Sequence, residues 1–201
     1  MMKRNNFPFS AVLGLNHAKT AIFIVLVNPR AGGLLISGPR GIGKSTLMRS
    51  TQELIERLWR DIPVSITEDR LFGTIDTEKA IYSGQKKLYP GIINEADQGV
   101  LYLDDVNLLR EDLLDSILDI AEVGTYQLER DGLSLRCDTS FTVIAAINPE
   151  SGMLSGACLD QFGLFVNVDN IHDENTRVEI LKRTISFEKD CASFCNLWKL
   201  E

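Results

Sequence analysis

The sequence predicts an α/β domain in which helices flank a parallel sheet and a β-hairpin is inserted before one strand. Short apolar runs of strand length alternate with longer stretches of helical periodicity, as in a parallel α/β sheet. A glycine-rich turn joins one such run to a helix, and an Asp-Gly pair separates two stretches of alternating polarity. At 201 residues, 44% of them hydrophobic, the chain has the size of one domain, to which we assign residues 1–201.

The first elements follow from apolar spacing and from prolines. Residues 16–27 are mostly apolar and stop shortly before Pro29, which predicts a helix that ends there. Residues 33–37 form a short apolar run typical of a buried parallel strand. Residues 44–59 are expected to form one long helix, because they carry apolar side chains at helical spacing, namely Leu47, Leu54, Ile55 and Leu58.

The later elements follow from the same criteria, and the mixed region 68–98 is the least regular. We expect a short helix at 77–82, strands at 99–103, 141–147 and 164–168, helices at 111–123 and 174–187, and hairpin strands at 125–128 and 133–137.

Charge and composition exclude several classes of protein. The net charge of −7 argues against a nucleic-acid surface, because such surfaces are usually basic. The apolar run 21–27 is too short to cross a membrane, and no signal-peptide pattern follows Lys3-Arg4, so we expect a cytoplasmic protein that binds no membrane. The four cysteines lack CxxC spacing, and Cys191 and Cys195 would share a helix face as half-buried thiols rather than metal ligands.

The glycine-rich turn at residues 38–45 fits the phosphate-binding pattern GxxxxGK[ST] between a strand and a helix. Its backbone N–H groups would point at phosphate oxygens, the Lys44 amine would bind the β- and γ-phosphates, and the Ser45 hydroxyl would coordinate Mg²⁺. We therefore expect ATP and Mg²⁺ as cofactors. The predicted nucleotide-binding residues are Gly38, Pro39, Arg40, Gly41, Ile42, Gly43, Lys44, Ser45 and Thr46.

Two carboxylates and an amide are predicted at the ends of later strands. Asp104 would hold Mg²⁺ through a water, and Asp105 would orient the water that attacks the phosphate. An Asp-Asp pair after a strand is otherwise often a helix cap or a solvated turn. Asn148 would contact the γ-phosphate or position the water, with a plain Asn-Pro turn as the alternative. The predicted catalytic residues are Lys44, Asp105 and Asn148, and the predicted metal ligands are Ser45 and Asp104.

Six runs outside the phosphate loop carry a family resemblance. They are FPFSAVLG at 7–14, TEDRLFGTID at 67–76, PGIINEA at 90–96, DDVNLL at 104–109, NPE at 148–150 and LDQFG at 159–163. The chain resembles the ATPase (I) subunit of magnesium chelatase, a member of the AAA+ superfamily, from Phe7 to about Arg183. The resemblance is specific, because generic AAA+ proteins lack TEDRLFGTID and PGIINEA.

This resemblance implies an AAA+ core whose subunits assemble into a ring with ATP bound between them. It also implies partners that together insert Mg²⁺ into protoporphyrin IX: other AAA+ subunits, a related subunit with a von Willebrand A domain, and a large porphyrin-binding subunit. By resemblance, Asn148 is the sensor-1 residue, and residues 125–137 form a hairpin inserted before it.

Three features depart from the family pattern. The family usually has glutamate at position 105, and the shorter Asp105 would retract the carboxylate by about an ångström, which can cost on the order of 10²-fold in rate. The family has an arginine finger at position 161, and its loss as Gln161 can cost roughly 10³–10⁵-fold. The chain stops at Glu201, where the family continues into a helical lid, so either the sequence is a fragment or the lid is absent or truncated.

Two further functions compete with the chelatase motor. Asp105 and Gln161 favour a MoxR-type module that uses ATP to order a complex with a von Willebrand A-type partner and hydrolyses it weakly or not at all. A DNA-handling AAA+ ATPase is disfavoured by the acidic charge and by the two specific runs. The sequence specifies neither the metal nor the tetrapyrrole.

Overall fold

The computed structural model describes residues 6–75, 88–130 and 133–199. Its helices are α1 Asn16–Val27, α2 Lys44–Thr51, α3 Glu68–Phe72, α5 Ile92–Glu95, α6 Glu111–Val123, α7 Gly156–Asp160, α8 Glu174–Lys189 and α9 Cys191–Leu197. Its strands are β1 Leu34–Ser37, β2 Trp59–Ile62, β3 Gly73–Ile75, β4 Leu88–Pro90, β5 Val100–Leu103, β6 Thr125–Arg130, β7 Leu133–Asp138, β8 Thr142–Ile147 and β9 Leu164–Asn167.

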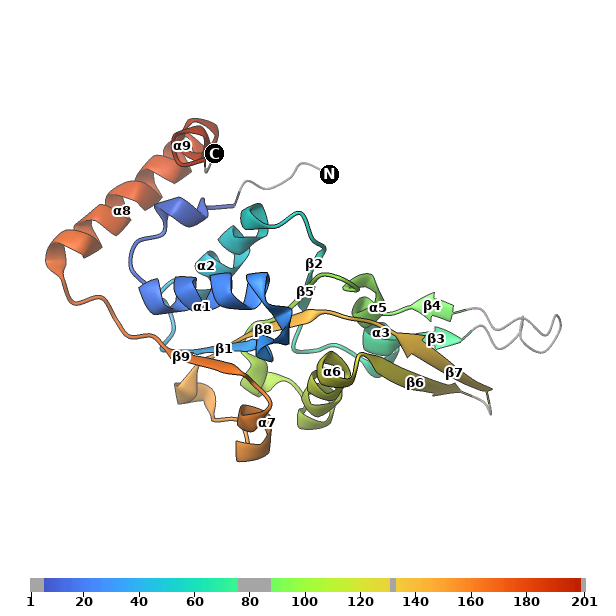
Figure 1. The fold of residues 1–201 in the computed structure, drawn as a ribbon. Coiled ribbons are helices and arrows are strands. Elements are labelled where there is room, and N and C mark those ends of the chain that lie inside the picture. The colour runs from blue at the N-terminus through green and yellow to red at the C-terminus, as the bar shows by residue number, and fades with distance from the viewer. Residues whose placement is uncertain (1–5, 76–87, 131–132, 200–201) are drawn as a thin grey trace.

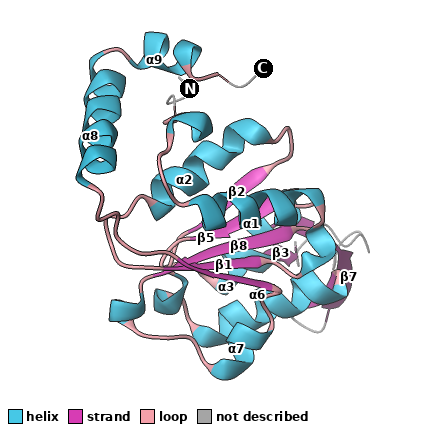
Figure 2. Cartoon of the chain, turned by 60° about the vertical axis from the view of Figure 1, so that its left-hand side comes forward, coloured by secondary structure: helices cyan, strands magenta, loops and turns pink. Residues whose placement is uncertain are grey.

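Five parallel strands form the central sheet in the order β2-β5-β8-β1-β9, which confirms the predicted fold class. Helices cover both faces, with α1 and α2 on one side and α6 and α7 on the other (Figure 2). Side chains alternate between the two layers, so Leu34 and Ile36 of β1 pack with α1 and α2 while Leu35 packs with α6. The sheet is therefore buried on both faces.

Two antiparallel hairpins and the last two helices extend from this core. Strands β6 and β7 pair from Thr125–Asp138 to Arg130–Leu133, as predicted, although the turn residues 131–132 lie outside the described part. Strands β3 and β4 form a second small sheet. Figure 1 shows both hairpins on one side of the core, with α8 and α9 on the other, beside the N-terminal segment.

The predicted helix 44–59 is too long. Helix α2 ends at Thr51, a 3₁₀ turn follows at Gln52–Leu54, and β2 then pairs with β5 in parallel. The carbonyl of Leu58 accepts a hydrogen bond from the Val100 N–H at 2.7 Å, so this segment is committed to the sheet. Tertiary pairing overrides the local helical periodicity here, and Leu58 is half exposed instead of facing a helix core.

The other elements agree with the sequence, apart from those it missed. Helices α1 and α6 have the predicted bounds, and the strands predicted at 33–37, 99–103, 141–147 and 164–168 are each observed within one or two residues. Elements α3, β3, β4, α5, α7 and α9 were not predicted, and the helix expected at 77–82 lies outside the described residues. Cys191 and Cys195 share one side of α9 with their sulfurs 3.9 Å apart, and both are half-buried.

No helix within the described ranges is long and apolar enough to cross a membrane.

Candidate nucleotide-binding site

The phosphate loop lies between β1 and α2, at the carboxyl end of the sheet. Gly41 and Gly43 have φ angles of 80° and 92°, which side-chain-bearing residues rarely adopt. The Gly38 N–H donates to the carbonyl of Ile147 at 3.2 Å, so the loop starts against the end of β8. The loop therefore has the backbone that a phosphate cradle requires, at the sheet edge where ligands bind in such folds.

The Lys44 side chain is hydrogen-bonded to the backbone of its own loop. Its Nζ donates to the carbonyls of Gly38 at 2.6 Å and Pro39 at 2.8 Å, and the side chain is almost fully buried. Burial lowers the pKa of Lys44, while the carboxylates of Asp105 and Asp104 act in the opposite direction. The ammonium group is thus held over the loop by carbonyls, which it can exchange for phosphate oxygens.

Ser45 and Asp104 form the pair predicted to hold the metal. The Ser45 hydroxyl donates to Oδ1 of Asp104 at 3.3 Å, although the two residues lie on α2 and at the end of β5. Because Mg²⁺ usually keeps several of its waters, this spacing suits an ion that Ser45 would bind directly and Asp104 through a water. The structure therefore brings together the two predicted metal ligands.

Tyr102 lies beneath this pair and was missed from the sequence. Tyr102 is on β5, two residues before Asp104, which directly follows that strand, and this spacing could have indicated that the two side chains lie on the same side. Its side chain is buried, and burial raises the pKa of Tyr102 with a further contribution from the Asp104 charge. The phenol is therefore a neutral neighbour of the metal pair at physiological pH.

Asp105 and Asn148 follow the ends of β5 and β8, which are neighbours in the sheet. Asp105 adopts a left-handed backbone conformation with φ 48°, uncommon for a residue with a side chain, and its charge acts on Lys44. Asn148 is 1% exposed, and its side chain caps the turn that follows. Its Oδ1 accepts from the Glu150 N–H at 3.3 Å, and its Nδ2 donates to the Ser151 hydroxyl at 3.1 Å. The bond to Ser151 uses one of the two N–H groups of Nδ2, so the other can still donate to a phosphate.

A cavity of about 800 Å³ adjoins the phosphate loop and supplies room for a nucleoside. One wall is the N-terminal segment, including Val12 and Leu13, and the facing wall is α8, including Ile180 and Thr184. These residues were not among the predicted site residues. The FPFSAVLG run at 7–14 could have indicated the first wall, because it is part of the family resemblance although the sequence assigned it no function.

Arg183 fastens α8 to the N-terminal wall. Its Nη1 donates to the carbonyl of Ala11 at 3.0 Å, and its guanidinium group lies 4.1 Å from the centre of the Trp198 ring. Phe7 packs on Phe187 and Phe194, with ring centres 5.2 Å and 5.4 Å away. These contacts therefore hold the N-terminal wall and the α8 wall of the cavity together.

Gln161 lies on a different flank of the molecule, directly after α7. Its Nε2 donates to Oδ1 of Asp119 on α6 at 3.2 Å. Its Oε1 is buried and, among the described residues, meets no hydrogen-bond donor. The side chain at the position expected to face a neighbouring subunit is thus held by its own subunit.

Comparison with known proteins places this site in a family context. Residues 33–161 match the model of the AAA domain (dynein-related subfamily). The magnesium-chelatase 38 kDa subunit of Rhodobacter capsulatus is 35% identical over 96% of this chain and 65% of its own length. The subunit of the same name from Cereibacter sphaeroides is 35% identical over 97% of this chain and 68% of its own. The chain thus spans about two thirds of the length of these relatives.

A solved structure shares the fold. It describes the complex between subunits BchI and BchD of magnesium chelatase, from a cryo-EM reconstruction. The similarity covers 98% of this chain and 71% of the matched chain, with a TM-score of 0.77 and 34% identity.

Proposed function

Because the chain belongs to the AAA+ family of magnesium-chelatase ATPase (I) subunits, we propose that it binds ATP with Mg²⁺ and hydrolyses it as the motor of a metal chelatase. The observation that carries the proposal is the 3.3 Å pair of Ser45 and Asp104 beside the phosphate loop. These oxygens come from two elements that only the folded sheet brings together. The proposed work is the insertion of Mg²⁺ into a porphyrin, as the names of the relatives suggest. The free cysteines suit the reducing cytoplasm.

We propose the following roles for the chain's own residues. Lys44 exchanges its bonds to the loop carbonyls for oxygens of the β- and γ-phosphates. The Ser45 hydroxyl would hold Mg²⁺ directly and Asp104 would hold it through a water, and the ion would supply positive charge beside the phosphates. Asp105 orients the attacking water from the turn after β5, and Asn148 donates from Nδ2 to the γ-phosphate or that water.

Assembly with other subunits belongs to the same proposal. We place the chain in a ring with other AAA+ subunits, beside a subunit that carries a von Willebrand A domain and a large porphyrin-binding subunit. The similarity to a structure of a BchI and BchD complex supports the first of these partnerships.

A second function has a specific observation in its favour. Gln161 is hydrogen-bonded to Asp119 within its own subunit and carries no charge for a neighbour's ATP. Together with the short Asp105, this favours a MoxR-type module that uses ATP binding to order a complex and hydrolyses it weakly.

Reconstitution separates the two functions. The chain is mixed with candidate chelatase subunits, ATP and Mg²⁺, and metallation of protoporphyrin is followed by fluorescence, with Lys44→Ala as the inactive control. Metallation that requires Lys44 supports the motor. ATP-dependent complex formation without turnover or metallation would instead support the assembly module.

A further inference from the structure

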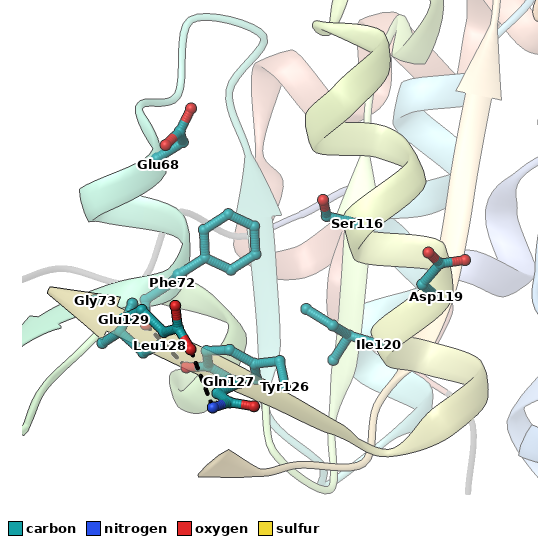
Figure 3. Close-up of a pocket in the computed structure, with 10 residues that line it drawn as sticks. All are labelled: Glu68, Phe72, Gly73, Ser116, Asp119, Ile120, Tyr126, Gln127, Leu128 and Glu129. Atoms are coloured by element: carbon teal, nitrogen blue, oxygen red, sulfur yellow. Dashed lines mark hydrogen bonds between the residues drawn. The ribbon is translucent and has the colours of Figure 1, made fainter. Parts of the chain in front are cut away.

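A second cavity, of about 630 Å³, lies between α3, α6 and β6 (Figure 3). Its described lining shares no residue with the nucleotide cavity, and no role proposed above uses it. Because its volume exceeds that of a single side chain, it has room for a short segment of another protein.

The rim of this cavity is acidic. Glu68, Asp119 and Glu129 line it from three different elements and are all exposed, and no lysine or arginine occurs among the described lining residues. Each carboxylate accepts a hydrogen bond, Glu68 from Arg110 at 3.1 Å, Asp119 from Gln161 at 3.2 Å and Glu129 from Gln127 at 3.1 Å. A carboxylate has about four acceptor positions, so all three retain capacity for a further donor.

The floor of the cavity is apolar and fixed. Ile120 and Leu128 are buried, and the rings of Phe72 and Tyr126 lie 5.9 Å apart. The Tyr126 hydroxyl donates to the carbonyl of Phe72 and contacts Oδ1 of Asn94, which holds the ring in place. An acidic rim above an aromatic and aliphatic floor suits arginine, whose stem packs on apolar surface and whose planar guanidinium stacks on rings and pairs with carboxylates.

The cavity adjoins the flank where a neighbouring subunit is expected. Asp119 lines the cavity and also holds Gln161, the position that the family resemblance directs at the next subunit's ATP. In a head-to-tail ring this flank meets the nucleotide face of the next subunit. In the present chain Arg49 and Arg177 line the nucleotide cavity and are exposed, with Glu188 nearby in the same lining, so this face offers arginine side chains to an acidic cavity.

We propose that the cavity between α3, α6 and β6 binds an arginine side chain from the nucleotide face of the adjoining AAA+ subunit. This inference rests on the ring assembly given under the proposed function. It adds an interface contact separate from the nucleotide itself.

The chemistry is tested with a blocked alanine peptide that carries two arginines, and with its counterpart in which neutral citrulline replaces both. NMR signals of the Ile120 and Leu128 methyl groups report binding in the cavity. We expect shifts with the arginine peptide, at least fivefold weaker binding of the citrulline peptide, and a loss of affinity of about tenfold in Asp119→Asn/Glu129→Gln. The exposed Glu122 lies on the same helix outside the cavity, so Glu122→Gln is the matched control and should bind as wild type. Equal binding of both peptides, or no methyl shift with either, would overturn the assignment.

The source of the arginine is tested on the partner subunit used for reconstitution. Asp119→Asn/Glu129→Gln should weaken association with that subunit by about tenfold, while Glu122→Gln should not. An unchanged association would refute the interface. Nucleotide-induced thermal stabilisation is measured on the same samples. If nucleotide does not stabilise the protein but the arginine peptide still binds, the proposed ATPase function is refuted while the assignment of the cavity as an arginine site is retained.

Discussion

Gln161 and Asp119 form a hydrogen bond, 3.2 Å from Nε2 to Oδ1, that connects the end of α7 to α6. From the family resemblance we expect an arginine at position 161 that would reach the ATP of the neighbouring subunit. Here the side chain is neutral and is engaged within its own subunit. The amide of Gln161 thus donates to the Asp119 carboxylate and carries no charge toward a neighbour.

The first prediction concerns the two departures in the hydrolytic machinery. Asp105→Glu should raise ATP turnover by up to about 10²-fold, because it extends the carboxylate toward the water. Gln161→Arg should add a further gain in an assembly where the side chain faces a neighbour's phosphate. Phosphate release is measured for each single variant and for the pair, beside a partner subunit. If wild type is already fast and the double variant is no faster, both departures are harmless.

A control isolates the contribution of Asp119. The carboxylate should pair with the guanidinium introduced by Gln161→Arg and hold it back, so adding Asp119→Asn should increase turnover further when the partner subunit is present at a saturating concentration. A decrease would mean that Asp119 orients the side chain at position 161 toward the neighbour.

The second prediction concerns nucleotide binding. ATP or ADP with Mg²⁺ at a hundredfold excess over Kd should raise the melting temperature by about 5–10 °C, since a ligand that binds only the folded chain stabilises it by mass action. Lys44→Ala should remove this rise and leave the fold intact, while the exposed Lys199→Ala should retain it. Thermal melts followed by circular dichroism provide the measurement. A full rise in Lys44→Ala would contradict the phosphate-loop assignment.

The third prediction concerns the metal. Wild type should bind ATP more tightly with Mg²⁺ than in EDTA, and Ser45→Ala and Asp104→Asn should each lose most of this difference, because their oxygens form the 3.3 Å pair. Affinity in EDTA should change little in either variant. Ser116→Ala, on the surface of α6 away from the loop, is the control for removal of a hydroxyl. Affinity is measured by titration with a fluorescent ATP analogue. If Mg²⁺ still strengthens binding in both variants as it does in wild type, the assignment of the metal ligands is wrong.

The sequence predicted the part of the fold that depends on local patterns. The phosphate loop needs glycines at Gly41 and Gly43 for positive φ, and the buried strands need apolar runs, so both are visible in the chain. Strand β2 was missed because Trp59–Ile62 is defined by its pairing with β5, and the preceding apolar residues continue a helical period. Long-range pairing of this kind leaves little local signal.

In the candidate site, too, the residues that belong to sequence motifs were predicted and those brought in by long-range packing were not. Lys44, Ser45, Asp104, Asp105 and Asn148 belong to motifs, and the structure gathers them at one edge of the sheet. The walls of the nucleoside cavity come from segments about 170 residues apart, and they are related only by contacts of the folded chain, such as Arg183 with Ala11 and Phe7 with Phe187. The bond of Gln161 to Asp119 likewise depends on the packing of α7 on α6, which spacing does not encode.

The fourth prediction concerns this wall. Arg183→Gln removes the contact of the guanidinium with Trp198 and weakens the bond to Ala11, so α8 should loosen from the N-terminal segment. We expect nucleotide affinity to fall by about 3–10-fold and amide exchange in α8 to speed up. The neighbouring exposed Lys182→Gln is the matched control and should change neither. If nucleotide affinity is unchanged while amide exchange in α8 is faster, α8 does not form part of the nucleotide-binding site.

The last prediction concerns assembly. An arginine finger acts on the ATP of the neighbouring subunit, so in a ring of identical chains every site would meet Gln161 instead of a cation. In a mixed ring a related subunit supplies that charge, while this chain contributes its phosphate loop and the Ser45–Asp104 pair to the shared site. We therefore expect the chain alone to sediment as a monomer or weak oligomer, with ATP hydrolysis arising only beside a partner AAA+ subunit. Sedimentation velocity and phosphate release with ATP and Mg²⁺, with and without the partner, decide the matter. A stable homohexamer that hydrolyses ATP without a partner would show that Gln161 is no obstacle and that the mixed ring is unnecessary.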